Sequence, residues 1–186
     1  MSNYPNINYG PLTKLIGQWQ GAKGVDISPE EDGPDTNEFY DNITFSPARD
    51  LDNADEQELV AVHYHQTVFR KRDNKMIHNQ TGYYIWDEAS QTIMHNFVIP
   101  RGIAVVALGS YREEGDALVM EFFAEQNDDY NNFSQSPFLK EKAETLSFKQ
   151  KVIVSDKILR YSQTTLVDIY GNEFEHTDNS MLNRVD

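Results

Sequence analysis

The sequence predicts an all-β protein, folded as a ten-stranded antiparallel up-and-down barrel. Glycine, proline and Asn/Asp clusters interrupt the chain at fairly regular intervals, and β-branched and aromatic residues fill the segments between them. This pattern is typical of many antiparallel strands that are joined by short turns. A sheet of ten such strands has two open edges unless it closes on itself, which favours a barrel.

Ten segments have the composition of strands. Hairpin-like turn residues separate several of them, such as Asp73-Asn74, Gly115 and Gly171-Asn172. The predicted strands are 18–27, 37–47, 58–71, 76–87, 91–98, 102–110, 116–125, 143–153, 158–169 and 172–185.

Two short helical segments are also expected. In the segment NYGPLTKLIG, Pro11 lies near a helix start, apolar residues follow on one face, and Gly17 ends the helix. We expect this helical turn to cover one end of the barrel. The long connection 127–142 is expected to hold a second helix at 137–142. The acidic stretches 28–38 and 48–58 are expected to be solvated loops, because neither has the alternating oxygen ligands of a calcium loop.

Closure of the sheet predicts a ligand cavity. About eight strands enclose only side chains or one small ligand, so ten strands are expected to leave a larger interior. A two-sheet sandwich is the alternative arrangement. The chain shows no internal repeat or linker, so residues 1–186 are expected to form a single domain.

Composition excludes several classes of partner and chemistry. The formal net charge of −14 repels nucleic acid and anionic membrane surfaces. The absence of cysteine rules out disulfides, thiolate metal sites and thiol nucleophiles. The segment at the N-terminus lacks the pattern of a secretory signal, so we expect a cytoplasmic protein. The expected partner is therefore a small molecule, and a homodimer is left open.

The sequence offers little support for nucleophilic or phosphate chemistry, because it contains neither Gly-x-Ser-x-Gly nor a phosphate-binding loop. Histidines are more informative. His63 and His65 are two apart in a predicted strand and point to one side, where they either bind a metal ion or hydrogen-bond across strands. The second interpretation is favoured, because no carboxylate follows at a recognised spacing. His95 is expected to be structural.

Two further histidines are candidates for ligand binding. His78 begins a strand that carries Tyr83, Tyr84 and Trp86, which suit the wall of a flat apolar ligand. His176 lies in the last predicted strand. A neutral imidazole in an apolar cavity is a competent haem ligand, although a structural role remains open for both residues.

Four segments resemble the nitrobindin-like haem-binding β-barrels, a family described as fatty-acid-binding-protein-like or lipocalin-like that includes the C-terminal domain of a THAP-type protein. LIGQWQGAKG resembles the Gly-x-Trp-x-Gly signature at the first strand. MIHNQTGYYIW, VIPRGIAVVALG and LRYSQTTLVDIYGNEFEHTDNSMLNR resemble later strands in the same order. Two features differ from the family: Ala22-Lys23 moves the next glycine to Gly24, and the residues after His176 are more polar, with Asp178 expected to hydrogen-bond the imidazole.

The resemblance implies that haem b is the cofactor and His176 the ligand of its iron. It places His78 in the pocket, with Ile77, Thr165 and Ile99 as further lining residues. It also implies ferric iron that binds nitric oxide or isomerises peroxynitrite, so an enzymatic activity stays open.

Two alternatives remain. One is a haem-free carrier of a fatty-acid-like ligand, whose carboxylate would pair with Arg101, Arg160 or Arg184. The other is a metal-dependent enzyme with its site at His63 and His65.

Overall fold

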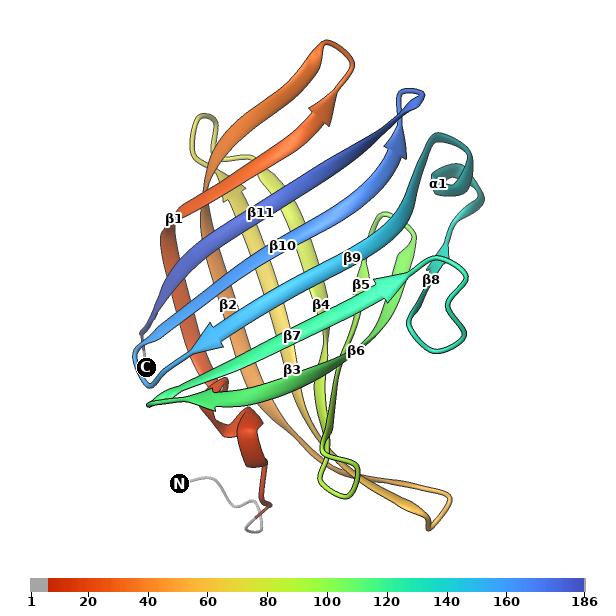
Figure 1. Ribbon diagram of the computed structural model, residues 1–186. Coiled ribbons are helices and arrows are strands. Elements are labelled where there is room, and N and C mark those ends of the chain that lie inside the picture. Colours follow the sequence, from red (N-terminus) through yellow and green to blue (C-terminus); the bar gives the residue numbers. More distant parts are fainter. Residues whose placement is uncertain (1–6, 186) are drawn as a thin grey trace.

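The chain forms a closed antiparallel β-barrel (Figure 1). The computed structural model describes residues 7–185, apart from the side chains of residues 49 and 50. Strand β5 pairs with β6 and β1 pairs with β11, and these pairings close the ring of ten strands. The predicted barrel is confirmed, and the two-sheet sandwich is excluded. The ring strands are β1 (Gly17–Glu30), β2 (Gly33–Asn53), β3 (Gln57–Arg70), β4 (Met76–Asp87), β5 (Thr92–Ile99), β6 (Ile103–Glu114), β7 (Ala117–Glu125), β9 (Ala143–Val154), β10 (Ile158–Ile169) and β11 (Asn172–Arg184).

One strand was missed. β8 (Asn132–Gln135) lies inside the segment predicted as a long connection, just before the expected short helix α1 (Pro137–Lys142). It pairs with the first half of β6, and the side-chain amide of Gln135 both donates to and accepts from the backbone of Thr145 on β9. β8 therefore fills the wall where β7 and β6 are no longer paired.

The two acidic stretches are not loops, so that prediction was wrong. β1 and β2 pair as far as Glu30 and Gly33, and β2 pairs with β3 from Asn53 and Gln57 onward. Only 31–32 and 54–56 are turns. These strand ends are mostly polar on both faces, so they lack the apolar alternation by which strands are recognised. Figure 1 shows the β1–β2 hairpin projecting beyond the rest of the barrel.

The predicted helical turn covers one end of the barrel. It forms the 3₁₀ segment η1 (Gly10–Lys14), with Leu12 and Leu15 fully buried in the core. Trp19 packs with them, and its indole nitrogen donates to the Leu15 carbonyl at 2.8 Å. This end is therefore filled by apolar side chains.

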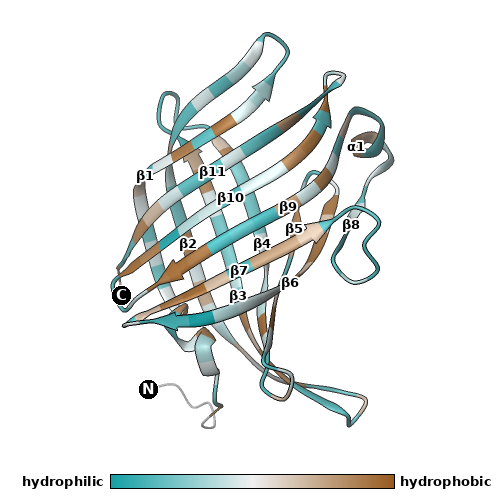
Figure 2. Cartoon of the chain, viewed as in Figure 1, coloured by the Kyte–Doolittle hydropathy of each residue, from teal (hydrophilic) through white to brown (hydrophobic). Residues whose placement is uncertain are grey.

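Along the ring strands, hydrophobic and hydrophilic residues alternate over much of their length (Figure 2). Burial alternates as well. In β4, the side chains of Gln80, Tyr84 and Trp86 are buried inside the barrel, whereas that of Tyr83 is exposed on the outer face. Neither helical segment of the described residues is long and apolar enough to cross a membrane.

Candidate functional site

A cavity of about 480 Å³ occupies the barrel end opposite η1. Its rim includes residues next to the turns between β1 and β2, β3 and β4, β5 and β6, and β10 and β11. All five residues predicted for the pocket line this cavity: Ile77, His78, Ile99, Thr165 and His176. The structure thus brings together residues from four strands.

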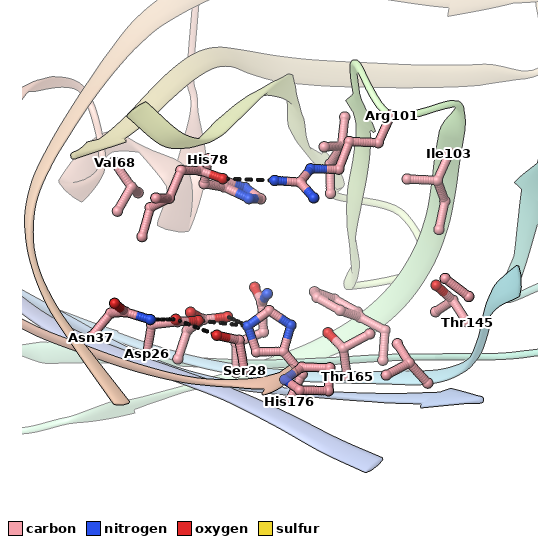
Figure 3. Close-up of a pocket in the computed structure, with 18 of the residues that line it drawn as sticks. Asp26, Ser28, Asn37, Val68, His78, Arg101, Ile103, Thr145, Thr165 and His176 are labelled. Carbon is pink, nitrogen blue, oxygen red and sulfur yellow. Dashed lines mark hydrogen bonds and ion pairs between the residues drawn. The ribbon is translucent and has the colours of Figure 1, made fainter. Parts of the chain in front are cut away.

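The two histidines lie on opposite walls of the cavity (Figure 3). His78 comes from β4, and His176 comes from β11, where it is the cross-strand partner of Thr165 on β10. The imidazole of His176 is therefore turned inward rather than out to solvent.

A β-bulge brings a carboxylate to His176. The register of β1 shifts between Gly21 and Gly24 against β2, and at the same place against β11. Before the bulge, Trp19 faces the core; after it, the inward positions are even-numbered and include Asp26. Because side chains alternate along a strand, one extra residue reverses which face each later residue occupies. Asp26 would otherwise face outward.

His176 is hydrogen-bonded to Asp26. Its Nε2 lies 2.6 Å from Oδ1 of Asp26 and 3.7 Å from Oδ2 of Asp178. The expected hydrogen bond to Asp178 is therefore wrong: the partner is Asp26, on the neighbouring strand. Burial would lower the pKa of His176, but the hydrogen bond to Asp26 and the charges of both aspartates outweigh burial and raise it. Burial would raise the pKa of Asp26, but the hydrogen bond to His176, the charge of His176 and the hydrogen bonds to Asp178 and Ser28 together lower it.

Asp178 provides the second carboxyl group of this cluster. Burial raises the pKa of Asp178 to about 7, although the positive charge of His176 acts to lower it. The folded protein therefore binds this proton more tightly than the unfolded chain does. As a result, the free energy of unfolding falls as the pH rises from 3.8, the ordinary pKa of the group, towards 7. Asp178 is thus a destabilising group at alkaline pH.

We expect Asp178→Asn to stabilise the protein more at pH 8 than at pH 5, by a difference on the order of 2 kcal/mol. An amide mimics the protonated carboxyl but does not ionise. Urea unfolding at the two pH values measures the difference, with the exposed Asp168→Asn as control. Equal effects of Asp178→Asn at both pH values would contradict the prediction.

A hydrogen-bonded chain fixes the proton of His78. Gln80 donates from Nε2 to the Tyr64 hydroxyl, so its Oε1 accepts from His78 Nε2 at 3.0 Å. The Tyr64 hydroxyl then donates to His95 Nε2 at 2.6 Å. Burial lowers the pKa of His78 and that of His95, the latter to about 3. Both imidazoles are therefore neutral, and Nδ1 of His78 keeps its lone pair.

Another buried network lies beside the cavity floor. The Tyr161 hydroxyl donates to Asp41 at 2.6 Å, and Gln66 donates to both oxygens of the same carboxylate at 3.1 and 3.2 Å. Burial raises the pKa of Asp41 to about 6. Gln66 and Tyr161 also line the cavity, so this network fixes part of its floor.

The other histidines have structural roles. His63 and His65 hydrogen-bond across strands to Thr81 and Asn79, both at 2.9 Å. His95 is fully buried and stacks on Tyr84. Within the described part of the chain, acidic and histidine side chains gather closely enough for a metal ion only at Asp26, His176 and Asp178. A metal site at His63 and His65 is therefore not supported.

Of the three arginines considered for a carboxylate ligand, only Arg101 lines the cavity. It donates to the Ile77 carbonyl at 3.0 Å. Arg160 is exposed on β10, and Arg184 lies at the closed end, where its guanidinium stacks on Trp19. The expectation that Arg160 or Arg184 could pair with the carboxylate of a ligand in the cavity is therefore wrong.

Sequence reasoning did not find Asp26, Asn37 or Ser28 as parts of the site. The shifted glycine at position 24 was the available signal, because an extra residue between two inward glycines indicates a bulge. Strict alternation from Trp19 would place Asp26 on the outer face.

A crystal structure of Rv2717c from M. tuberculosis matches with a TM-score of 0.70 and 19% identity, over 94% of this chain and 95% of that one. At this identity the match shows the fold alone. A search of curated proteins finds no match. The model of the THAP4-like, heme-binding beta-barrel domain matches residues 8–184, so the chain belongs to that family.

Proposed function

We propose that this protein binds haem b in the barrel cavity, with His176 as the axial ligand of the iron. The observation that carries the proposal is the imidazole of His176, held in the wall of a cavity of about 480 Å³. Ligand cavities commonly fall between roughly 300 and 1,000 Å³. Membership in a haem-binding family supports the same conclusion.

The lining of the cavity suits a porphyrin. Its walls combine apolar side chains, which suit the ring, with polar ones, and cationic side chains at the rim suit the carboxylates of haem. The apolar residues include Val68, Ile77, Phe97, Ile99, Ile103, Val105, Phe133, Phe148, Val167 and Ile169, and the cations are Arg70, Lys75 and Arg101.

The hydrogen bond of His176 bears on this proposal. Its Nε2, the nitrogen that can reach the iron of a flat porphyrin, is bonded to Asp26. Haem binding therefore requires Asp26 to release this nitrogen, because Nδ1 lies next to the ring carbon that carries Cβ.

When bound, haem would supply an iron centre that takes up nitric oxide or converts peroxynitrite to nitrate. The chain's own contribution is to surround the ring with apolar side chains such as Phe97 and Phe148, and to present His78 from the opposite wall. Because its Nε2–H is committed to Gln80, His78 can only accept a hydrogen bond through Nδ1.

Titration of the purified protein with haemin at pH 8 tests the proposal. We expect a sharp Soret band that saturates at one haem per chain. Absorbance that rises without saturation, as for haem adsorbed on a surface, would contradict it.

Haem affinity is expected to fall as the pH is lowered from 8 to 5.5. Iron binds the neutral imidazole, and the raised pKa of His176 lets protons compete within this range. Below that pKa the loss approaches about tenfold per pH unit. Titrations at several pH values measure it. Asp178→Asn serves as the control, because removing that charge should move the loss to lower pH. A constant affinity would contradict the prediction.

A second candidate function is a haem-free carrier of a lipophilic carboxylate. Arg101 at the cavity rim favours it. In that case a fluorescent fatty acid would bind, Arg101→Ala would abolish binding, and haemin would not produce a saturating Soret band.

A further inference from the structure

Two carboxylates lie directly opposite each other on strands β1 and β11. Asp26 and Asp178 are cross-strand partners, and both side chains line the cavity. Like charges in directly opposite positions destabilise a sheet unless a cation offsets them. Among the described residues, His176 is the one basic side chain that pairs with either carboxylate. The two aspartates therefore form an acidic pair with a single imidazole to balance it.

The three side chains converge closely enough to hold a metal ion. Nε2 of His176 lies 2.6 Å from Oδ1 of Asp26 and 3.7 Å from Oδ2 of Asp178. One ligand atom from each residue lies within 4.8 Å of the other two. Neighbouring ligands of a tetrahedral zinc ion, with bonds of about 2.0–2.1 Å, are roughly 3.3 Å apart. Small movements of the two carboxylates, one outward and one inward, would therefore give this geometry.

An unsatisfied acceptor beside the pair is a second, independent sign of a ligand. Asn37 is the cross-strand partner of Asp26 on β2, lines the cavity and is only 5% exposed. Its Nδ2 donates to Asp26 (Figure 3), but its Oδ1 has no hydrogen-bond partner among the described residues. A buried acceptor without a partner destabilises the folded protein. Water bound to a metal ion is a strong donor, so an ion held by Asp26 would bring such a donor to this wall.

We propose that Asp26, Asp178 and His176 bind a divalent transition-metal ion such as Zn²⁺, with water as a further ligand. The ion takes the place of the proton that Nε2 of His176 now shares with Asp26. Bonds form from the ion to Nε2 and to one oxygen of each carboxylate, and the displaced protons pass to solvent. This site goes beyond the proposed haem function and does not depend on it. Because haem iron also needs Nε2, the two ligands exclude each other.

The ligand set selects among metal ions. An imidazole nitrogen suits Zn²⁺ and other late transition metals, whereas Mg²⁺ and Ca²⁺ are bound by oxygen ligands. Divalent first-row ions generally bind a given site more tightly as zinc than as manganese. We therefore expect Zn²⁺ to bind more tightly than Mn²⁺, and Mg²⁺ at the same concentration to leave the site free.

Calorimetric titration of the haem-free full chain with Zn²⁺ at neutral pH tests the site. Binding should saturate at one ion per chain. Loss of a residue that only supports a metal ligand costs about 10- to 100-fold, so Asp26→Asn and Asp178→Asn should each weaken binding at least tenfold. Asp168→Asn, at an exposed position of β10, and His63→Ala, which removes an imidazole bonded to Thr81, are the matched controls and should leave binding unchanged.

Two spectroscopic measurements identify the ligands directly. X-ray absorption at the zinc edge should show one imidazole and oxygen ligands at about 2.0–2.2 Å. Nitrogen NMR should show that Nε2 of His176 loses its proton when Zn²⁺ is added, while the signals of His63 stay in place. Circular dichroism should show an intact barrel in each variant, so that a loss of zinc binding is not a loss of folding.

Zinc uptake that never saturates, or that is unchanged in both Asp26→Asn and Asp178→Asn, would overturn the site. Haem gives a separate readout: Zn²⁺ should inhibit haem uptake by the wild type but not by Asp178→Asn. If zinc binds at these residues and haemin does not bind, the metal site stands and the proposed function fails. If haemin binds and zinc does not, the proposed function stands and the metal site fails.

Discussion

His176→Ala is expected to weaken haem binding by more than about 100-fold and to abolish the sharp Soret band. Loss of a residue that merely supports a metal ligand costs about 10- to 100-fold, so loss of the ligand itself should cost more. The apolar walls and the rim cations remain in this variant, so residual haem should bind loosely and without a protein ligand. Haemin titration followed by absorption spectroscopy measures the loss.

Two histidine variants serve as controls for this experiment. His63→Ala removes an imidazole that bonds to Thr81 away from the cavity, and it should leave the spectrum unchanged. His78→Ala should keep the axial ligand and alter only the reaction with small ligands. Added imidazole should restore a Soret band to His176→Ala by entering the space left by the side chain. A wild-type spectrum in His176→Ala would show that iron is bound elsewhere.

Most of the barrel could be predicted because its signals are local. Turn residues and alternating apolar positions lie within a few residues of each other, and they placed ten strands and both helical segments. The resemblance to a known family, rather than alternation, placed His78 and His176 in the pocket. The hairpin ends and β8 lack an apolar face, so local composition identified them as connections.

The aspartate partner of His176 depends on information that is not local. Asp26 lies 150 residues from His176 in sequence. Its inward orientation depends on the bulge after Gly21, and its oxygen is positioned by Ser28 and by Asn37 on another strand. Alternation cannot show where a strand gains an extra residue, so Asp178, two residues from His176, was the natural but incorrect choice.

Gly24→Ala is expected to destabilise the protein by about 3 kcal/mol. A Cβ at this position would overlap the ring of Phe39, which is only 1% exposed and has little room to move. Overpacking of a buried site typically costs about 1–3 kcal/mol, and overlap with a rigid ring lies at the upper end. Since Asp26 is two residues further along β1, a shift of this backbone would also draw its carboxylate away from His176.

A double-mutant cycle separates this clash from a general effect of alanine. Phe39→Leu shortens the ring side chain, so Gly24→Ala should cost less in the Phe39→Leu background than in the wild type. A coupling energy of about 0.5–3 kcal/mol is expected for such directly contacting residues. Urea unfolding of the four proteins measures it, with Lys23→Ala at the exposed bulge position as control. If the two substitutions are additive, the close approach of Gly24 to Phe39 does not limit the structure.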